Sequence, residues 1–349
     1  MVGILLKGEG GLINLGGNST IKVGTNGIGV YGEKAIVTLT TDQTIETKEN
    51  GVGIYTAGTS KIVGGKTLTY KYTGINTKTG IATLFAGTNS QNNINIQLSN
   101  STNTTGGMVG VFVSGRGTFN NTGNITGSTS AKEAGIIAEN TNVINNGKIT
   151  LSGNPTSLNN TNVAIYSKTT NSITNSGDIS VGKNSIGIYG HRIINTANIT
   201  VGDKSIATYS KSGNVNLSGN ITIGKNEAVA LFTSGNNQNI STTANLSIGD
   251  GSYGYVIKGN RTTLTINSPS TTVGNNTVFT YSSDKNANIV NNTNLTSTGK
   301  NNYGLYTSGY TENNADINFA SSTGNVGIYV KTANNITNTG SISVGDNSI

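Results

Sequence analysis

Short alternations of apolar and polar residues run along the whole chain, and Gly, Asn and Asp separate them. The stretch that begins at Val163 contains three such alternations, "VAIYS", "SITNS" and "DISVG". Alternation over four or five residues is a strand signal, and Gly and Asn at the boundaries are turn signals. The pattern therefore predicts a long succession of short β-strands and almost no α-helix.

These alternations repeat with a period of about 25 residues. "VGKNSIGIYG" starts at Val181, "VGDNSI" starts at Val344, and a second phrase recurs as "NSGDISVG", "NTANITVG" and "NTGSISVG". Alignment on Tyr189 gives thirteen anchor positions: Tyr31, Tyr55, Phe85, Phe112, Ile137, Tyr166, Tyr189, Tyr209, Phe232, Val256, Tyr281, Tyr306 and Tyr329. One repeat cannot bury its apolar strip alone, so repeats must stack. We predict a right-handed parallel β-helix of about 13 coils, each coil being one repeat with three short strands.

The repeat extends over the 349 residues, which predicts one continuous β-helix over residues 1–349. Because the last phrase stops where Gly-Ile-Tyr would follow, we expect a fragment of a longer chain. Two coils are longer, at about residues 56–85 and 138–166. Leucine-rich repeats and WD40 blades fit less well, since the first need fixed Leu positions and the second about 40–45 residues.

Strand parity suggests which side chains are inside. Residues one and three before each anchor are mostly Ile, Val or Leu, as in Ile186 and Ile188, and we expect them in the core. Residues two before the anchor are mostly Gly or Ala, which predicts an outer groove beside outward-facing anchors. The opposite arrangement, with the rings inside, stays open because both parities are partly apolar.

The outward ladder is predicted to comprise Tyr166, Tyr189, Tyr209, Phe232, Tyr281, Tyr306 and Tyr329. Such a ladder could bind a partner, because Tyr offers rigid area with a polar tip, or could simply stabilise the sheet. Asn121, Asn145, Asn175, Asn195 and Asn338 recur at one corner, where stacked amides can bond between coils.

Composition limits the chemistry. The chain has no Cys, one His and 11% charged residues, which excludes thiolate metal sites and a Cys nucleophile, so we expect no metal and no cofactor. Its net charge of +7 fits either an anionic partner or simple solubility. Lys168, Lys211 and Lys331 lie near the ladder but not in consecutive coils, so nucleic-acid binding is not expected.

Catalytic groups are sparse. His191 is predicted to be an exposed surface residue, and Asp and Glu are too scattered to suggest the carboxylate pair of a polysaccharide-degrading enzyme. One turn position reads Lys183, Asp203, Lys225 and Asp250 in consecutive coils, which predicts an exposed ion-pair ladder. We therefore expect that the chain is not an enzyme.

Taken together, the tandem "GIYG", "NTGSISVG" and "VGDNSI" phrases in this Cys-free chain resemble the passenger repeats of large fusobacterial-type autotransporter adhesins. The resemblance extends from about Thr20 to Ile349. It implies a secreted type V passenger on the extracellular face of a Gram-negative outer membrane, held there by a C-terminal barrel absent from this sequence. It also implies a host-cell or bacterial surface protein or glycan as partner.

Contact loops are expected where coils are longest. The surplus of the first long coil brings together basic and aromatic residues, so the predicted ligand contacts are Lys66, Tyr70, Lys71, Tyr72 and Lys78. The surplus of the second is "SGNPTSLNN". The main hypothesis is a non-enzymatic adhesin segment that displays such loops. The alternatives are a purely structural stalk and, with less support, a polysaccharide-degrading β-helix.

Overall fold

The computed structural model describes residues 1–74, 78–100, 106–128, 132–155, 161–332 and 334–349, and this part of the chain contains β-strands and turns but no helix. The chain forms two compact units, unit 1 (Met1–Gly182) and unit 2 (Lys183–Ile349). In each unit, every coil contributes its first strand to sheet A, its second to sheet B and its third to sheet C. The expectation of one continuous β-helix over residues 1–349 stays a prediction.

Unit 1 contains seven strands in each sheet. Sheet A is formed by β1 (Val2–Leu6), β4 (Ile28–Glu33), β7 (Val52–Ala57), β10 (Gly80–Ala86), β13 (Met108–Val113), β16 (Glu133–Ala138) and β19 (Val163–Ser167). Sheet B is formed by β2 (Gly11–Leu15), β5 (Ala35–Leu39), β8 (Lys61–Val63), β11 (Gln91–Asn92), β14 (Gly117–Asn121), β17 (Thr141–Asn145) and β20 (Ser172–Asn175). Sheet C is formed by β3 (Thr20–Val23), β6 (Gln43–Thr47), β9 (Thr67–Tyr72), β12 (Asn95–Asn100), β15 (Ile125–Gly127), β18 (Ile149–Leu151) and β21 (Ile179–Val181).

Unit 2 has the same composition of seven strands per sheet. Sheet A is formed by β22 (Ile186–Gly190), β25 (Ile206–Ser210), β28 (Val229–Thr233), β31 (Tyr253–Ile257), β34 (Val278–Ser282), β37 (Tyr303–Thr307) and β40 (Val326–Val330). Sheet B is formed by β23 (Arg192–Asn195), β26 (Val215–Leu217), β29 (Asn239–Thr242), β32 (Thr263–Ile266), β35 (Asn288–Asn291), β38 (Tyr310–Asn313) and β41 (Ile336–Asn338). Sheet C is formed by β24 (Ile199–Val201), β27 (Asn220–Ile223), β30 (Asn245–Ile248), β33 (Ser270–Val273), β36 (Asn294–Ser297), β39 (Ile317–Phe319) and β42 (Ile342–Val344).

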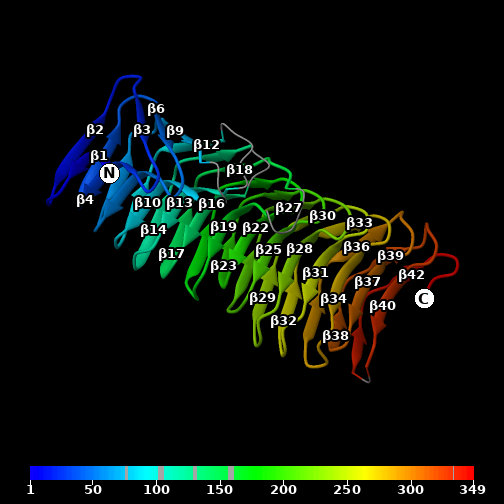
Figure 1. Ribbon diagram of the computed structural model, residues 1–349. Coiled ribbons are helices and arrows are strands. Elements are labelled where there is room, and N and C mark those ends of the chain that lie inside the picture. Colours follow the sequence, from blue (N-terminus) through cyan, green and yellow to red (C-terminus); the bar gives the residue numbers. More distant parts are fainter. Residues whose placement is uncertain (75–77, 101–105, 129–131, 156–160, 333) are drawn as a thin grey trace. The chain divides into compact units, whose positions relative to one another are not determined.

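Within each unit, each strand pairs in parallel with the strand three places later in the chain (Figure 1). Equivalent residues of successive coils lie opposite each other, as with Tyr31 and Tyr55 in unit 1 and Tyr281 and Tyr306 in unit 2. The prediction of a parallel β-helix with a repeat of roughly 25 residues is therefore confirmed. Of the two longer coils, residues 75–77 and 156–160 lie outside the described residues, so the predicted loop "SGNPTSLNN" is described only up to Pro155.

The core lies between the three sheets. The residue before the anchor is buried in most coils, as predicted, for example Ile188 and Leu231. The Gly or Ala two residues before the anchor also points inward, so the prediction of an outer groove there is wrong. A Cβ on Gly29 would lie 3.0 Å from Ile45 Cγ2, and one on Gly187 would lie 3.2 Å from Ile199 Cγ2. Small residues occur at this position because an Ile from sheet C already fills the space.

The residue three before the anchor lies on the outer face, contrary to the prediction. In β37, the ring of Tyr303 contacts the anchor ring of Tyr306, with 5.5 Å between the centroids, so both are on the same side of the sheet. Ile186 and Ile206 at this position are only half-buried. Two successive residues, those one and two before the anchor, both face inward. A strict alternation of faces therefore assigns the residue three before the anchor to the wrong side.

One predicted anchor was displaced by a single residue. Leu84, and not Phe85, lies opposite Tyr55 and Phe112, while Phe85 is fully buried and its ring lies 5.1 Å from that of Phe119. A shift of one residue moves a side chain to the other face of a strand. The sequence "TLFA" offers two large apolar residues in a row, and the larger one goes inside.

Buried amides connect the coils at the corner between sheets B and C. In unit 1, Asn92, Asn121 and Asn145 each donate from Nδ2 to the Oδ1 of the next asparagine, over 2.8, 2.7 and 2.7 Å, the last bond ending on Asn175. Each donates a second bond to the backbone oxygen two residues later, as from Asn145 to Gly147 over 2.8 Å. In unit 2, Asn195 donates to Ala197 and Ser218 oxygens, and Asn338 accepts from Asn313.

Candidate binding surfaces

The predicted ligand-contact patch does not form as expected, because Tyr70 and Tyr72 are fully buried. The Tyr70 hydroxyl lies 2.6 Å from Thr47 Oγ1 and donates to the Gly51 oxygen over 3.0 Å. The Tyr72 hydroxyl donates to the Lys78 oxygen over 2.7 Å. Burial raises the pKa of both tyrosines. Both rings therefore belong to the core of unit 1 and cannot contact a ligand in this structure.

The parity of β9 explains the correction. Leu68, Tyr70 and Tyr72 alternate with Thr69 and Lys71, and the set that contains the Leu points inward. Tyr70 takes the interior place that Ile45 and Leu98 occupy in the neighbouring coils. Gly80 makes room for it, since a Cβ there would lie 2.3 Å from the Tyr70 hydroxyl. The alternation with Leu68 was a readable signal for this placement.

The lysines of the same patch, Lys66, Lys71 and Lys78, are exposed. Lys71 lies opposite Glu46 in the sheet, and Glu46 pairs with Lys22 at 3.3 Å. The three lysines remain surface groups without the aromatic partners that the sequence suggested.

The anchor aromatics of unit 2 form a stripe along the outer face of sheet A. This aromatic stripe comprises Tyr189, Tyr209, Phe232, Tyr281, Tyr306 and Tyr329. Its rings stack in two runs, with centroid distances of 4.8 and 4.9 Å around Tyr209 and of 5.3 and 4.9 Å around Tyr306. Val256 separates the two runs, because it holds the anchor position between Phe232 and Tyr281. Neighbouring rings cover one another's faces, so edges and hydroxyl groups point to solvent.

In unit 1, the anchor Tyr166 also lies on the outer face of sheet A. It lies opposite Ile137 and borders a hollow of about 260 Å³, whose walls include Val109, Ala134 and Val163. These apolar residues are anchors or lie three before an anchor, so they share the outer face of sheet A. The predicted ladder therefore forms in unit 2, and its unit 1 member has an aliphatic neighbour.

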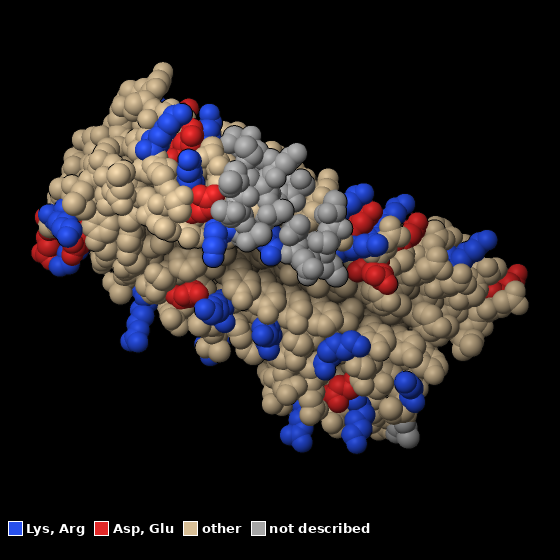
Figure 2. All heavy atoms as spheres, in the orientation of Figure 1, with Lys and Arg blue, Asp and Glu red and all other residues tan. Residues whose placement is uncertain are grey.

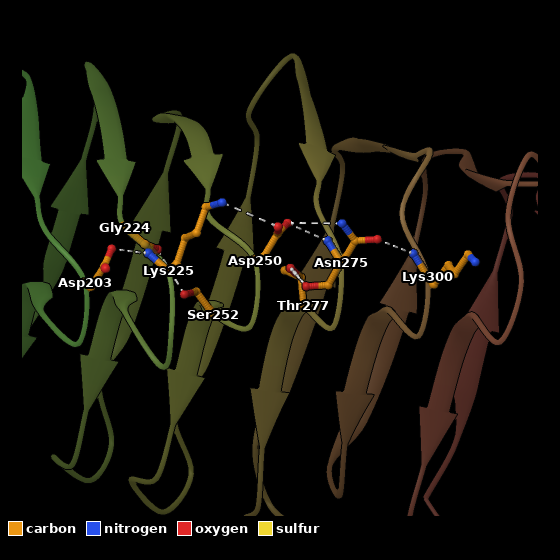
Figure 3. A network of polar contacts seen from close by, with 8 residues as sticks. All are labelled: Asp203, Gly224, Lys225, Asp250, Ser252, Asn275, Thr277 and Lys300. Carbon is orange, nitrogen blue, oxygen red and sulfur yellow. Dashed lines mark hydrogen bonds and ion pairs between the residues drawn. The ribbon is translucent and has the colours of Figure 1, made fainter.

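The turns from sheet C to sheet A in unit 2 carry paired charges (Figure 3). Lys183 and Asp203 lie 4.0 Å apart, and Lys225 and Asp250 lie 3.7 Å apart, which confirms the predicted exposed ion-pair ladder. Asp250 Oδ1 also accepts the backbone N–H of Asn275 over 2.9 Å, and this bond, together with Lys225, holds the pKa of Asp250 below its usual range. These carboxylates are engaged in coil-to-coil bonding.

The turns from sheet A to sheet B in unit 2 are different. Together with Arg192, the first residue of β23, they carry six exposed cations and one carboxylate, Asp284, as counted over the described residues of the unit. We call these cations the basic edge: Arg192, Lys211, Lys258, Arg261, Lys285 and Lys331. Of the six, only Lys211 and Lys331 were placed beside the ladder from the sequence, because only the assignment of the turns to one corner brings all six residues into a single row.

His191 lies in the first of these turns. Its Nδ1 is 2.7 Å from Ser212 Oγ, and burial, followed by the nearby Lys211, lowers its pKa. It is half-buried rather than exposed as predicted, because the next coil covers one side of the ring. Among the described residues, no group of three or more His, Cys, Asp or Glu side chains could hold a metal ion.

Comparison with known proteins gave no match, whether to a family model, to a curated protein or to a solved structure. Over the residues that the structure describes, there is no helix with the length and apolar character needed to cross a membrane.

Proposed function

We propose that this chain is a non-enzymatic segment of a cell-surface adhesin, which attaches cells to a host-cell or bacterial surface partner. In this proposal it acts on the extracellular face of a Gram-negative outer membrane. The chain supplies a β-solenoid scaffold, and the outward side chains of its strands and turns make the contacts. The resemblance of the repeat phrases to autotransporter passengers is the basis for the location.

The observation that carries the proposal is the difference between the inward and the outward residues of each strand. Inward positions repeat the same residue types from coil to coil, and side-chain amides and backbone N–H groups bond between coils. Outward positions vary and are largely uncharged (Figure 2). A constant interior with a variable exterior is suited to display, since binding residues can change without loss of the scaffold.

The test uses the whole chain, folded and labelled, on fixed host epithelial cells and on Gram-negative bacterial cells. We expect saturable binding that unlabelled chain displaces. A chain that shows β-sheet circular dichroism but binds no cell type would favour the structural stalk instead. Hydrolysis of a polysaccharide panel, lost on replacement of acidic residues, would overturn the non-enzymatic assignment. Antibodies against the chain should label intact cells that make it.

A further inference from the structure

The basic edge of unit 2 holds most of the chain's excess positive charge. Its six cations and the one carboxylate of the same turns give a net charge of +5, against +7 for the whole chain. All six cations are exposed. A row of like charges repels itself, so its presence on one corner favours a partner of opposite sign.

These cations are not neutralised within the protein. None of the six forms an ion pair within 4.0 Å with the described carboxylates, whereas Lys183 and Lys225 in the same unit both do. Asp284 instead uses its carboxylate to accept the backbone N–H of Arg261 over 2.7 Å. The positive ends of the basic edge therefore remain available to an external anion.

The spacing suits a linear ligand. Lys211 and Lys258 lie two coils apart and Lys258 and Lys331 lie three coils apart, which is about 10 Å and about 14 Å at the spacing of neighbouring strands. Arg192, Arg261 and Lys285 stand in the same series of turns. A chain with repeated negative groups can follow such a row and contact several cations at once.

The adjacent aromatic stripe decides between two kinds of polyanion. Single-stranded nucleic acid is held by bases that stack on exposed aromatic faces. Here the ring faces cover one another at 4.8 to 5.3 Å, and Lys258 Nζ lies 4.5 Å from the centre of the Tyr281 ring. The stripe offers tyrosine hydroxyl groups, which can hydrogen-bond to sugar hydroxyls. Arg192 and Arg261 can bind sulfate or carboxylate groups through two parallel N–H donors.

We propose that the basic edge of unit 2, with the aromatic stripe beside it, binds a linear acidic polysaccharide that carries sulfate or carboxylate groups. This inference rests on the proposed adhesin function and names its partner class. It makes unit 2 the part of the chain that recognises the glycan.

The test measures binding of the whole chain to immobilised heparin as a function of NaCl concentration. The double variant Lys258→Gln/Arg261→Gln should weaken binding about tenfold and reduce the slope of log K against log salt by about 2. The matched control, Lys183→Gln/Lys225→Gln, removes the same charge from paired cations of the same unit and should change the affinity by less than about threefold. Circular dichroism verifies that both variants are folded.

Equal weakening in the two double variants, or no heparin binding at low salt, would overturn the proposal. Tighter binding to a single-stranded oligonucleotide than to heparin would overturn it in favour of a nucleic-acid partner. Cell binding separates this proposal from the adhesin proposal. If cells bind the basic-edge variant with the same affinity as the unaltered chain, the adhesin proposal stands and the proposal of an acidic glycan partner is wrong. If the chain binds heparin but binds no cell type, the proposal of an acidic glycan ligand stands and the adhesin proposal is wrong.

Discussion

The turns that join sheet A to sheet B differ between the two units in how their charges are matched. Counted with the strand residues that adjoin them, the unit 1 turns carry five cations and three carboxylates among the described residues, and Lys34 pairs with Glu9 while Lys168 pairs with Glu139 at 2.8 Å. Counted in the same way, the unit 2 turns carry six cations and one carboxylate, with no ion pair among the described residues. The fold position is the same, so the scaffold does not dictate the charge. What distinguishes the units is the choice of outward residues.

The largest expected effect comes from substitution of the inward-facing glycines of sheet A, which both units share. Gly135→Val in unit 1 and Gly187→Val in unit 2 each add a branched side chain at an inward position. Even a Cβ alone would lie 2.5 Å from a backbone oxygen of the next coil at either site. We expect each to lower the free energy of unfolding by about 3 kcal/mol, measured by urea denaturation. The exposed controls Thr126→Val and Thr200→Val should change it little. If the glycine variants were as stable as the unaltered chain, the inward assignment of these glycines would be contradicted.

A smaller effect concerns the buried amides, which run without a break from Asn92 to Asn175 in unit 1 but are interrupted in unit 2 by Leu217, Thr242 and Ile266. Asn145→Leu deprives Gly147 and Asn175 of the N–H donor that each oxygen now accepts. We expect a loss of about 2 kcal/mol in unfolding free energy, since buried acceptors would lack a donor. Asn146→Leu, at an exposed position, is the control. A neutral Asn145→Leu would mean that the amide row does not stabilise unit 1.

Each unit also buries a tyrosine hydroxyl, and the one in unit 2 predicts a pH effect. Burial raises the pKa of Tyr255 to about 12, above the ordinary value of about 10. The unfolded chain therefore loses this proton first, so stability is full below pH 10 and falls by about 1.4 kcal/mol per pH unit from there to about pH 12. Tyr255→Phe should make that part of the profile less steep, and the slope that remains belongs to Tyr70 and Tyr72, whose pKa burial also raises. A profile of unchanged slope in Tyr255→Phe would place the titrating group elsewhere.

The smallest effect tests the comparison directly. Glu9→Gln together with Glu139→Gln releases Lys34 and Lys168 from their partners and moves the unit 1 turns closer to the charge of the basic edge. We expect heparin affinity to rise about two- to threefold, because exposed pairs contribute little and each released cation adds one contact. Surface plasmon resonance at fixed salt measures this. A fall in affinity would show that these carboxylates take part in binding.

Several features could be predicted from local sequence. The recurrence of Gly-Ile-Tyr and of Asn-x-Gly-x-Ile-x-Val-Gly determined the coil length and the parallel pairing, because each copy can bury its apolar side only against the next. The outward position of Tyr189 and Tyr209 also followed, since charged or polar residues share their parity. The ion pairs of Lys183 and Lys225 could be foreseen because their turn position is aligned in consecutive coils.

By itself, then, the sequence determined the period, the parallel strands and the identity of most outward anchors, all of which depend on neighbours along the chain or one repeat away. The tertiary structure alone decided the inward placement of Gly29, because that depends on how much space Ile45 leaves from another strand. It alone also brought six cations onto one corner of unit 2. Charges in separate turns act together only when the coils are stacked, because their interaction depends on distance in space.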